Sequence, residues 1–166
     1  MTEADREAIR QMLEAHNTLT LATACEDRPW AASLFFASDE KLNLYFVSDH
    51  RTRHAREIES GHDVVATVNA DCALWTEVRG LQIEGSARKV TGLGRVKALS
   101  VYLGKFHDVR ALFEAPQNAD EETIAQRLRA ANMYQLEPRW VRLIDNSKWF
   151  GYKLEVDLTA PASEAE

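Results

Sequence analysis

The sequence is poor in the residues that build covalent or metal-bound frameworks. Its 166 residues include only two cysteines, Cys25 and Cys72, which form no Cys-x-x-Cys pair, so neither a zinc site nor a disulfide framework is expected. The five histidines are scattered and form no His-x-x-His or His-Glu-x-x-His pair, which argues against a bound metal. A haem needs only one histidine ligand and is not excluded in this way.

Charge and hydrophobicity argue against two further classes of protein. The formal net charge is −6, so there is no basic surplus to neutralise nucleic-acid phosphates or an anionic membrane surface. No apolar run approaches the length that spans a bilayer, and the charged, amphipathic N-terminus is unlike a signal peptide. We therefore expect a cytoplasmic protein with neither a nucleic-acid nor a membrane partner.

Nucleotide-loop and hydrolase motifs are also missing. Gly92-Leu93-Gly94 lacks the third glycine of a dinucleotide fingerprint, and no strand–helix–strand pattern surrounds it, so it predicts a turn. No serine lies in a Gly-x-Ser-x-Gly elbow. Without internal repeats or low-complexity linkers, residues 1–158 are expected to form one domain, and the small, polar residues 159–166 a disordered tail.

The pattern of apolar residues predicts a mainly β protein with peripheral helices. Thr2-Glu3-Ala4-Asp5 resembles a capping box, and the apolar residues after it recur at helical spacing, which indicates a helix over about 3–16. Asp120 is the expected N-cap of another helix. Helical character is also expected from about residue 96 to 113. Period-two alternation predicts about seven strands joined by polar turns, which favours a closed or nearly closed antiparallel barrel. The expected strands cover residues 18–22, 30–36, 42–48, 64–69, 81–90, 140–144 and 150–158.

The stretch Ser48-Asp49-His50-Arg51-Thr52-Arg53-His54 follows a predicted strand and opens a short helix that ends near Gly61. Unpaired backbone N–H groups and the helix dipole favour an anion at such a position. Arginine, histidine and hydroxyl side chains would add charge-assisted hydrogen bonds. The alternative is a solvated helix face, because Arg53 and Glu57 are spaced as an ordinary i,i+4 pair.

The aromatic residues are mostly expected in the core. Phe35 and Phe36 are adjacent in a predicted strand, and neighbouring strand residues point to opposite faces. One of the two must therefore point outward, toward a ligand or a partner subunit.

Taken in order, these segments resemble the FMN-binding split-barrel family of pyridoxamine 5′-phosphate oxidase-like proteins. The resemblance is carried by the helix–strand order over about residues 3–90 and by three motifs. Within the family, the YhbP-like bacterial group is the most similar. The motifs are Thr52-Arg53-His54-Ala55, Arg79-Gly80-Leu81-Gln82 and the stretch from Asp145-Asn146 to Phe150-Gly151-Tyr152-Lys153.

The resemblance implies a homodimer with two FMN sites at the subunit interface. Thr52, Arg53 and His54 would hold the phosphate, with Arg51 near. His54 stands where the family usually has lysine, so the phosphate contact would depend on pH. The remaining expected contacts are Ser33, Leu34, Phe35 and Phe36 beside the flavin and ribityl chain, Val47 and Ser48 at the phosphate end, and Gln82, with Trp75 or Trp149, from the partner chain.

One departure concerns the substrate. The oxidases that make pyridoxal phosphate end in an arginine-containing signature, and the segment from Trp149 to Glu155 has no counterpart to it. Pyridoxamine phosphate is therefore not the expected substrate, and no catalytic acid–base pair is identified. The first hypothesis is an FMN-dependent oxidoreductase acting on a small molecule. The alternatives are a non-enzymatic flavin- or haem-binding protein and a structural dimer that has lost its ligand.

Overall fold

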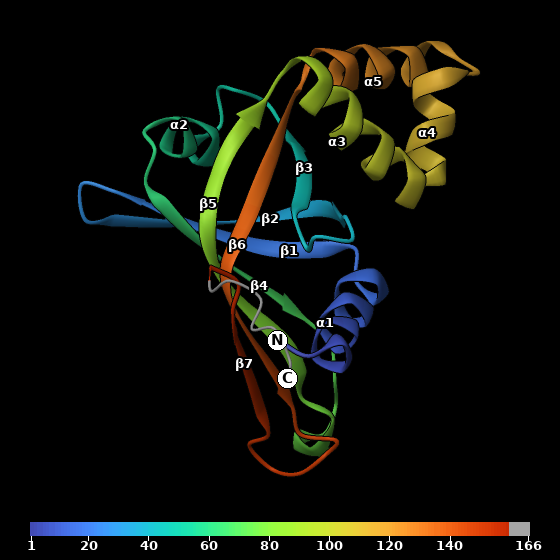
Figure 1. Cartoon of the computed structure of the whole chain (residues 1–166). Helices are drawn as coiled ribbons and strands as arrows, with labels where there is room; N and C mark the ends of the chain where they lie inside the picture. The colour runs from blue at the N-terminus through green and yellow to red at the C-terminus, as the bar shows by residue number, and fades with distance from the viewer. Residues whose placement is uncertain (160–166) are drawn as a thin grey trace.

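The computed structural model describes residues 1–159. In it, the chain folds into an antiparallel barrel with helices at its periphery (Figure 1). The strands are β1 (Thr18–Cys25), β2 (Arg28–Ser38), β3 (Leu44–Ser48), β4 (Asp63–Asn69), β5 (Arg79–Val90), β6 (Asn132–Asp145) and β7 (Lys153–Asp157). The helices are α1 (Glu3–Ala15), α2 (Arg53–Glu59), α3 (Gly92–Lys105), α4 (His107–Glu114) and α5 (Ala119–Ala130), with a 3-10 turn η1 (Trp75–Glu77).

Six strands close the barrel in the order β3-β2-β1-β4-β5-β6, because β6 pairs back onto β3. The remaining strand, β7, pairs with the C-terminal part of β6, on the same edge of β6 that pairs with β3 nearer its N-terminal end. Every pairing is antiparallel. The prediction of a mainly β split barrel with peripheral helices is confirmed.

The split in the barrel lies along β2. This strand pairs with β1 from Arg28 to Phe35 but reaches β3 only through Phe36, Ala37 and Ser38. Its second edge is therefore free of a neighbouring strand before Phe36, and such an edge leaves backbone groups available to another molecule.

Alternate residues of the barrel strands point inward and form one core. The helix α1 adds Ile9, Met12 and Leu13 to this core. The capping box predicted at its start is present, because Thr2 and Asp5 bond each other's backbone N–H groups. The strand residues of the core are Leu19, Leu21, Phe36, Leu44, Phe46, Val64, Ala66, Val68, Leu81, Ile83, Ala87, Tyr134, Leu136, Val141, Leu143 and Val156.

Three helices leave the barrel between β5 and β6 and gather at the end where α2 also lies (Figure 1). Lys105 ties α3 to α1, because its Nζ donates to the carbonyls of Leu13 at 3.0 Å and His16 at 2.5 Å. The ammonium also lies 4.3 Å from the centre of the Phe36 ring, and burial lowers the pKa of Lys105 to about 8.

Several predicted boundaries were wrong. The helical stretch over 96–113 is two helices separated at Phe106, and α5 is capped by Asn118 rather than Asp120. The strand expected at 140–144 runs from Asn132 to Asp145. Pro138 conceals its first half, because proline is uncommon within a paired strand. It is accommodated where a bulge between Glu84 and Gly85 shifts the register.

Two expectations concern the chain's end and membranes. Within the predicted tail, Thr159 donates through its N–H and hydroxyl to Asp157, and residues 160–166 lie outside the described residues. Across residues 1–159, no helix has the length and apolar character needed to cross a membrane.

Candidate functional site

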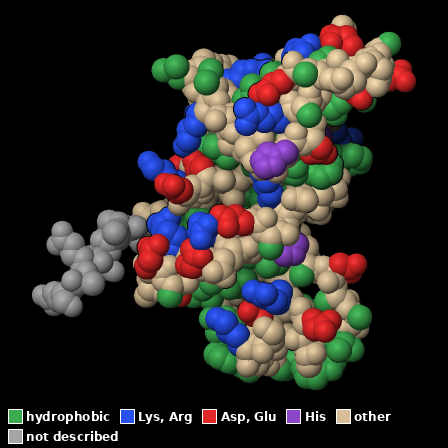
Figure 2. Space-filling view, turned by 90° about the vertical axis from the view of Figure 1, so that its right-hand side faces the viewer, with side chains coloured by type: hydrophobic (Ala, Val, Ile, Leu, Met, Phe, Trp, Pro, Cys, Tyr) green, Lys and Arg blue, Asp and Glu red, His purple; other side chains and the backbone are tan. Residues whose placement is uncertain are grey.

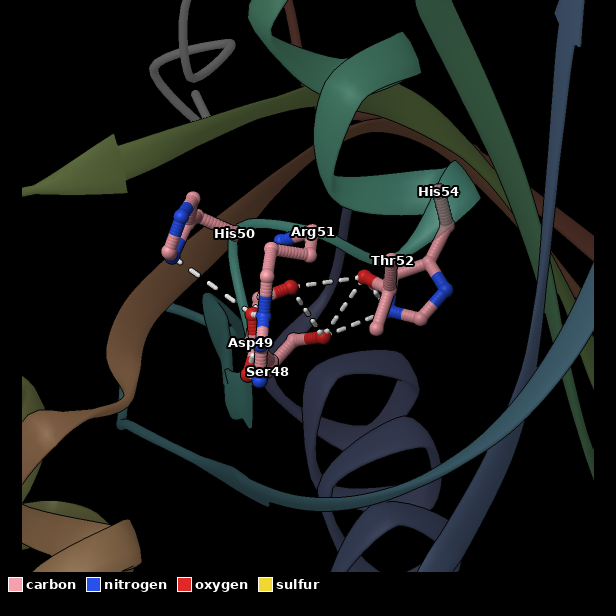
Figure 3. A network of polar contacts seen from close by, with 6 residues as sticks. All are labelled: Ser48, Asp49, His50, Arg51, Thr52 and His54. Carbon is pink, nitrogen blue, oxygen red and sulfur yellow. Dashed lines mark hydrogen bonds and ion pairs between the residues drawn. The ribbon is translucent and has the colours of Figure 1, made fainter.

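The predicted anion loop folds into a small polar network at the end of β3 (Figure 3). The Nε2 atom of His54 lies 2.7 Å from Ser48 Oγ and 3.2 Å from Thr52 Oγ1. The two hydroxyl oxygens are 3.1 Å apart, and Thr52 donates its proton to the carbonyl of Asp49 at 2.8 Å. The structure therefore brings Ser48, Thr52 and His54 together and turns their polar atoms toward one another.

The imidazole of His54 is buried, with only 6% of the residue exposed. Burial lowers the pKa of His54 below its ordinary value, and the carboxylate of Glu57 opposes this in part. The neutral ring therefore supplies hydrogen bonding at neutral pH without a fixed positive charge.

This burial predicts an acid-sensitive fold. The unfolded chain binds a proton at His54 as the pH falls through about 6.5, whereas the folded chain resists protonation until a lower pH. The unfolding free energy should therefore fall as the pH drops below about 6.5. Urea unfolding at a series of pH values measures this, and His54→Gln should flatten the slope in that window.

The control is His107→Gln, which changes an exposed histidine at the start of α4. Its slope should match that of the wild type. Equal slopes for the wild type and His54→Gln would contradict the assignment of the acid sensitivity to the buried ring.

Arg51 lies on the outside of the same loop. Its Nε and Nη2 donate to the carboxylate of Asp49, at distances down to 2.7 Å, and these hydrogen bonds hold the pKa of Asp49 well below its usual range. The Arg51 side chain is 77% exposed, and exposed ion pairs contribute little to stability. An incoming anion could therefore displace Asp49 from Arg51 at small cost.

Arg53 is held at the start of α2 by several neighbours. Its Nε donates to Glu57 Oε1 at 2.7 Å, and its Nη2 donates to the carbonyl of Arg28 at 2.8 Å. The guanidinium also lies 5.0 Å from the ring centre of Trp30. The carboxylate of Glu57 accepts a second hydrogen bond, from Thr23 Oγ1. The i,i+4 pairing considered as the alternative is thus present, and it positions a guanidinium that retains free N–H groups.

The predicted flavin-contacting residues of β2 divide between its two faces. Ser33 and Phe35 are exposed, and Phe35 is the outward aromatic, 58% exposed and packed edge-on against Phe106. Leu34 is half-buried and Phe36 is fully buried in the core. The Phe36 side chain, expected to border a ligand, is instead enclosed in the core of this chain, because the residue is 0% exposed and pairs with Phe46 of β3.

Gln82 is exposed on β5, and its Oε1 accepts from Arg142 at 3.1 Å. Ser33, Thr20, Thr67 and Gln82 are successive register partners on β2, β1, β4 and β5. Three inter-strand spacings therefore separate Gln82 from Ser33, a distance of roughly 14 Å. Within one chain, Gln82 therefore lies apart from the residues of β2.

Val47 and Ser48 also line a cleft of about 900 Å³, which lies between this loop and α5. In the part of the chain that the structure describes, no cluster of three or more histidine, cysteine or acidic residues is arranged to hold a metal ion. The groups at the loop that can bind a ligand are therefore guanidinium, hydroxyl and imidazole groups.

Comparison with known proteins gives the family. Residues 5–144 match the family described as Pyridoxamine 5′-phosphate oxidase. The chain belongs to this family. A similar curated member is the UPF0306 protein YhbP of Salmonella schwarzengrund, 27% identical over 148 residues that cover 89% of each chain. This match confirms the predicted likeness to the YhbP-like group.

Solved structures of the pyridoxamine 5′-phosphate oxidase-like fold superimpose on the chain. A putative pyridoxamine 5′-phosphate oxidase from Listeria innocua gives a TM-score of 0.64 at 17% identity, covering 84% of this chain and 98% of that one. A heme binding protein from Mycobacterium smegmatis gives 0.71 at 15% identity, covering 96% and 60%. These likenesses show the shared split barrel.

Sequence reasoning missed the residues that hold the predicted ones in place. Thr23 and Trp30 come from β1 and β2, far along the chain from Arg53, and no local pattern connects them. Glu57 was visible as the i,i+4 partner, but its burial became apparent only in the fold. Arg127 of α5, which lines the cleft, carries no motif.

Proposed function

We propose that the chain is an FMN-binding flavoprotein, an FMN-dependent oxidoreductase acting on a small molecule. The observation that carries the proposal is the pair of guanidinium groups, Arg51 and Arg53, on a hydroxyl-rich loop that Arg53 connects to the first residues of β2. Membership of the pyridoxamine 5′-phosphate oxidase family supports it.

The donor set fits a phosphate. Each guanidinium carries five N–H groups in a planar fork, and Arg53 uses only its Nε and Nη2 in the hydrogen bonds to Glu57 and the Arg28 carbonyl. The hydroxyls of Ser48 and Thr52 can rotate toward a stronger acceptor. In this proposal Thr52 and Arg53 hold the phosphate, Arg51 adds charge, and His54 orients the hydroxyls from beneath.

The free edge and outer face of β2 would hold the rest of the cofactor. Phe35 offers an exposed aromatic surface, and Ser33 a hydroxyl, on the side away from the core. Bound FMN would supply hydride and electron transfer, while the protein provides orientation and exclusion of water. No residue of the chain is assigned as a catalytic acid or base.

The site is proposed to be completed by a second copy of the chain. The outer face of β2, β1, β4 and β5 carries small uncharged residues such as Ala31, Ser33, Thr20 and Thr67, which permit close approach of a second sheet. A two-fold dimer through this face would bring the partner's Gln82 toward the flavin.

The lower end of the molecule offers further contacts for a partner. Figure 2 shows hydrophobic side chains gathered there, the end formed by η1 and the β6–β7 turn in Figure 1. Trp75 and Trp149 are 64% and 62% exposed at this end, and large exposed aromatic side chains are typical of an interaction surface. In the proposed dimer either tryptophan would reach the partner's flavin.

A second candidate function is non-enzymatic binding of flavin or haem. His50 supports it, because its ring is 69% exposed beside the cleft at α5 and makes only a 3.5 Å contact with Asp49. An accessible imidazole is a suitable haem ligand, and similar structures include a heme binding protein.

Anaerobic mixing of FMN-loaded protein with NADH or NADPH separates the two candidates. An oxidoreductase should bleach the flavin absorption and regain it on exposure to an electron acceptor, over repeated cycles. A flavin that stays oxidised with both donors and with reduced small molecules would support a binding protein.

A further inference from the structure

The cleft between the end of β3 and α5 is only partly accounted for by the phosphate loop. One wall is the stretch from Val47 to Arg51, and its volume of about 900 Å³ is within the usual range for small-molecule sites. The opposite wall comes from α5 and the residues after it: Ile124, Arg127, Leu128, Ala130 and Ala131.

The α5 wall is mainly apolar. Ile124 is 45% exposed although it is a large aliphatic residue, and Leu128 stands one turn further along the same helix. Val47 faces them from β3. These three side chains would bury the hydrocarbon part of a ligand, since each square ångström of apolar surface removed from water is favourable.

Arg127 is the charged group available in this cleft. Among the described residues, its side chain makes no hydrogen bond or ion pair, whereas Arg51 and His50 both contact the carboxylate of Asp49. A single uncommitted guanidinium matches one carboxylate through two parallel hydrogen bonds.

We infer that this cleft binds an amphipathic carboxylate, with the carboxylate on Arg127 and the apolar body between Val47, Ile124 and Leu128. Its role as the substrate class of the flavin site rests on the proposed function, because the cleft shares Val47, Ser48 and Arg51 with the phosphate loop. Binding itself requires no flavin.

Decanoate is the probe, titrated calorimetrically into the full chain. One decanoate should bind per chain, and decyltrimethylammonium, with the same tail and the opposite charge, should not bind. No heat from decanoate, or equal binding of the two probes, would overturn the inference.

Two variants locate the site. Arg127→Gln removes the guanidinium and should weaken decanoate on the order of ten-fold or more, whereas Arg110→Gln, on α4 and outside the cleft, should not. Ile124→Ser should also weaken it, and Leu93→Ser, which changes an 88% exposed leucine on α3, should not. Unchanged decanoate affinity in both cleft variants would place the ligand elsewhere and refute the inference.

FMN titration of the same proteins keeps the two proposals apart. Arg127→Gln should retain FMN affinity, and Arg53→Ala should retain decanoate affinity. If the wild type binds decanoate but does not bind FMN, the proposed flavin function is wrong and the carboxylate site remains. A change of molecular mass on gel filtration in both cleft variants would show that a second copy covers the cleft, and would refute the inference.

Discussion

Arg53→Ala is expected to weaken FMN binding by about 1.5–3 kcal/mol, because it removes charge-assisted hydrogen bonds to the phosphate. It should also destabilise the fold by about 1–3 kcal/mol. The carboxylate of Glu57, whose side chain is only 9% exposed, loses its cationic partner in this variant. Fluorescence titration with FMN and urea unfolding measure the two effects.

A second substitution separates the two roles of Arg53. Adding Glu57→Gln to Arg53→Ala removes the buried charge, so much of the lost stability should return while FMN affinity stays low. Arg56→Ala, which removes an exposed arginine from the same helix, is the control for the general loss of positive charge. FMN affinity that is unchanged in Arg53→Ala would place the phosphate elsewhere.

Gly85→Ala should produce the largest loss of stability, about 3 kcal/mol. A Cβ atom at this position would lie 2.2 Å from the carbonyl oxygen of Glu137 and 3.0 Å from the Cα of Pro138. These are backbone atoms at the bulge where β5 meets β6, so they cannot rotate away. For a domain of this size, the Tm should fall by roughly 6–12 °C.

The matched control is Gly104→Ala in α3, where no atom lies within 4 Å of the added Cβ. Alanine is the better helix former, so this variant should gain up to about 1 kcal/mol. A Gly85→Ala protein as stable as the wild type would show that the β5–β6 seam is not as tightly packed as the structure describes.

The sequence was most informative where a pattern is local. Period-two alternation located most strands, and the Thr2–Asp5 capping box was visible three residues apart. The first half of β6 was missed because Pro138 opposes a strand assignment, and its acceptance depends on the bulge opposite, more than fifty residues earlier in the chain. The bulge in one strand accommodates the proline in the other, and neither segment alone predicts this match.

The loop from Ser48 to His54 shows the same limit at the site. Its composition indicated an anion site, and the structure does bring Ser48, Thr52 and His54 together. Composition could not predict which way each side chain points. His54 turns inward. Arg53 is held by Trp30 and by Glu57, which itself accepts a hydrogen bond from Thr23. Burial decides both, and burial follows from the closed barrel.

The proposed cofactor and assembly are tested together by the visible absorption spectrum of the purified protein, recorded before and after addition of FMN and gel filtration. The account predicts flavin bands that stay with the protein and elute at the mass of a dimer. A Soret band in the purified protein would move the function to haem binding, and a colourless protein that does not retain FMN would contradict the central claim.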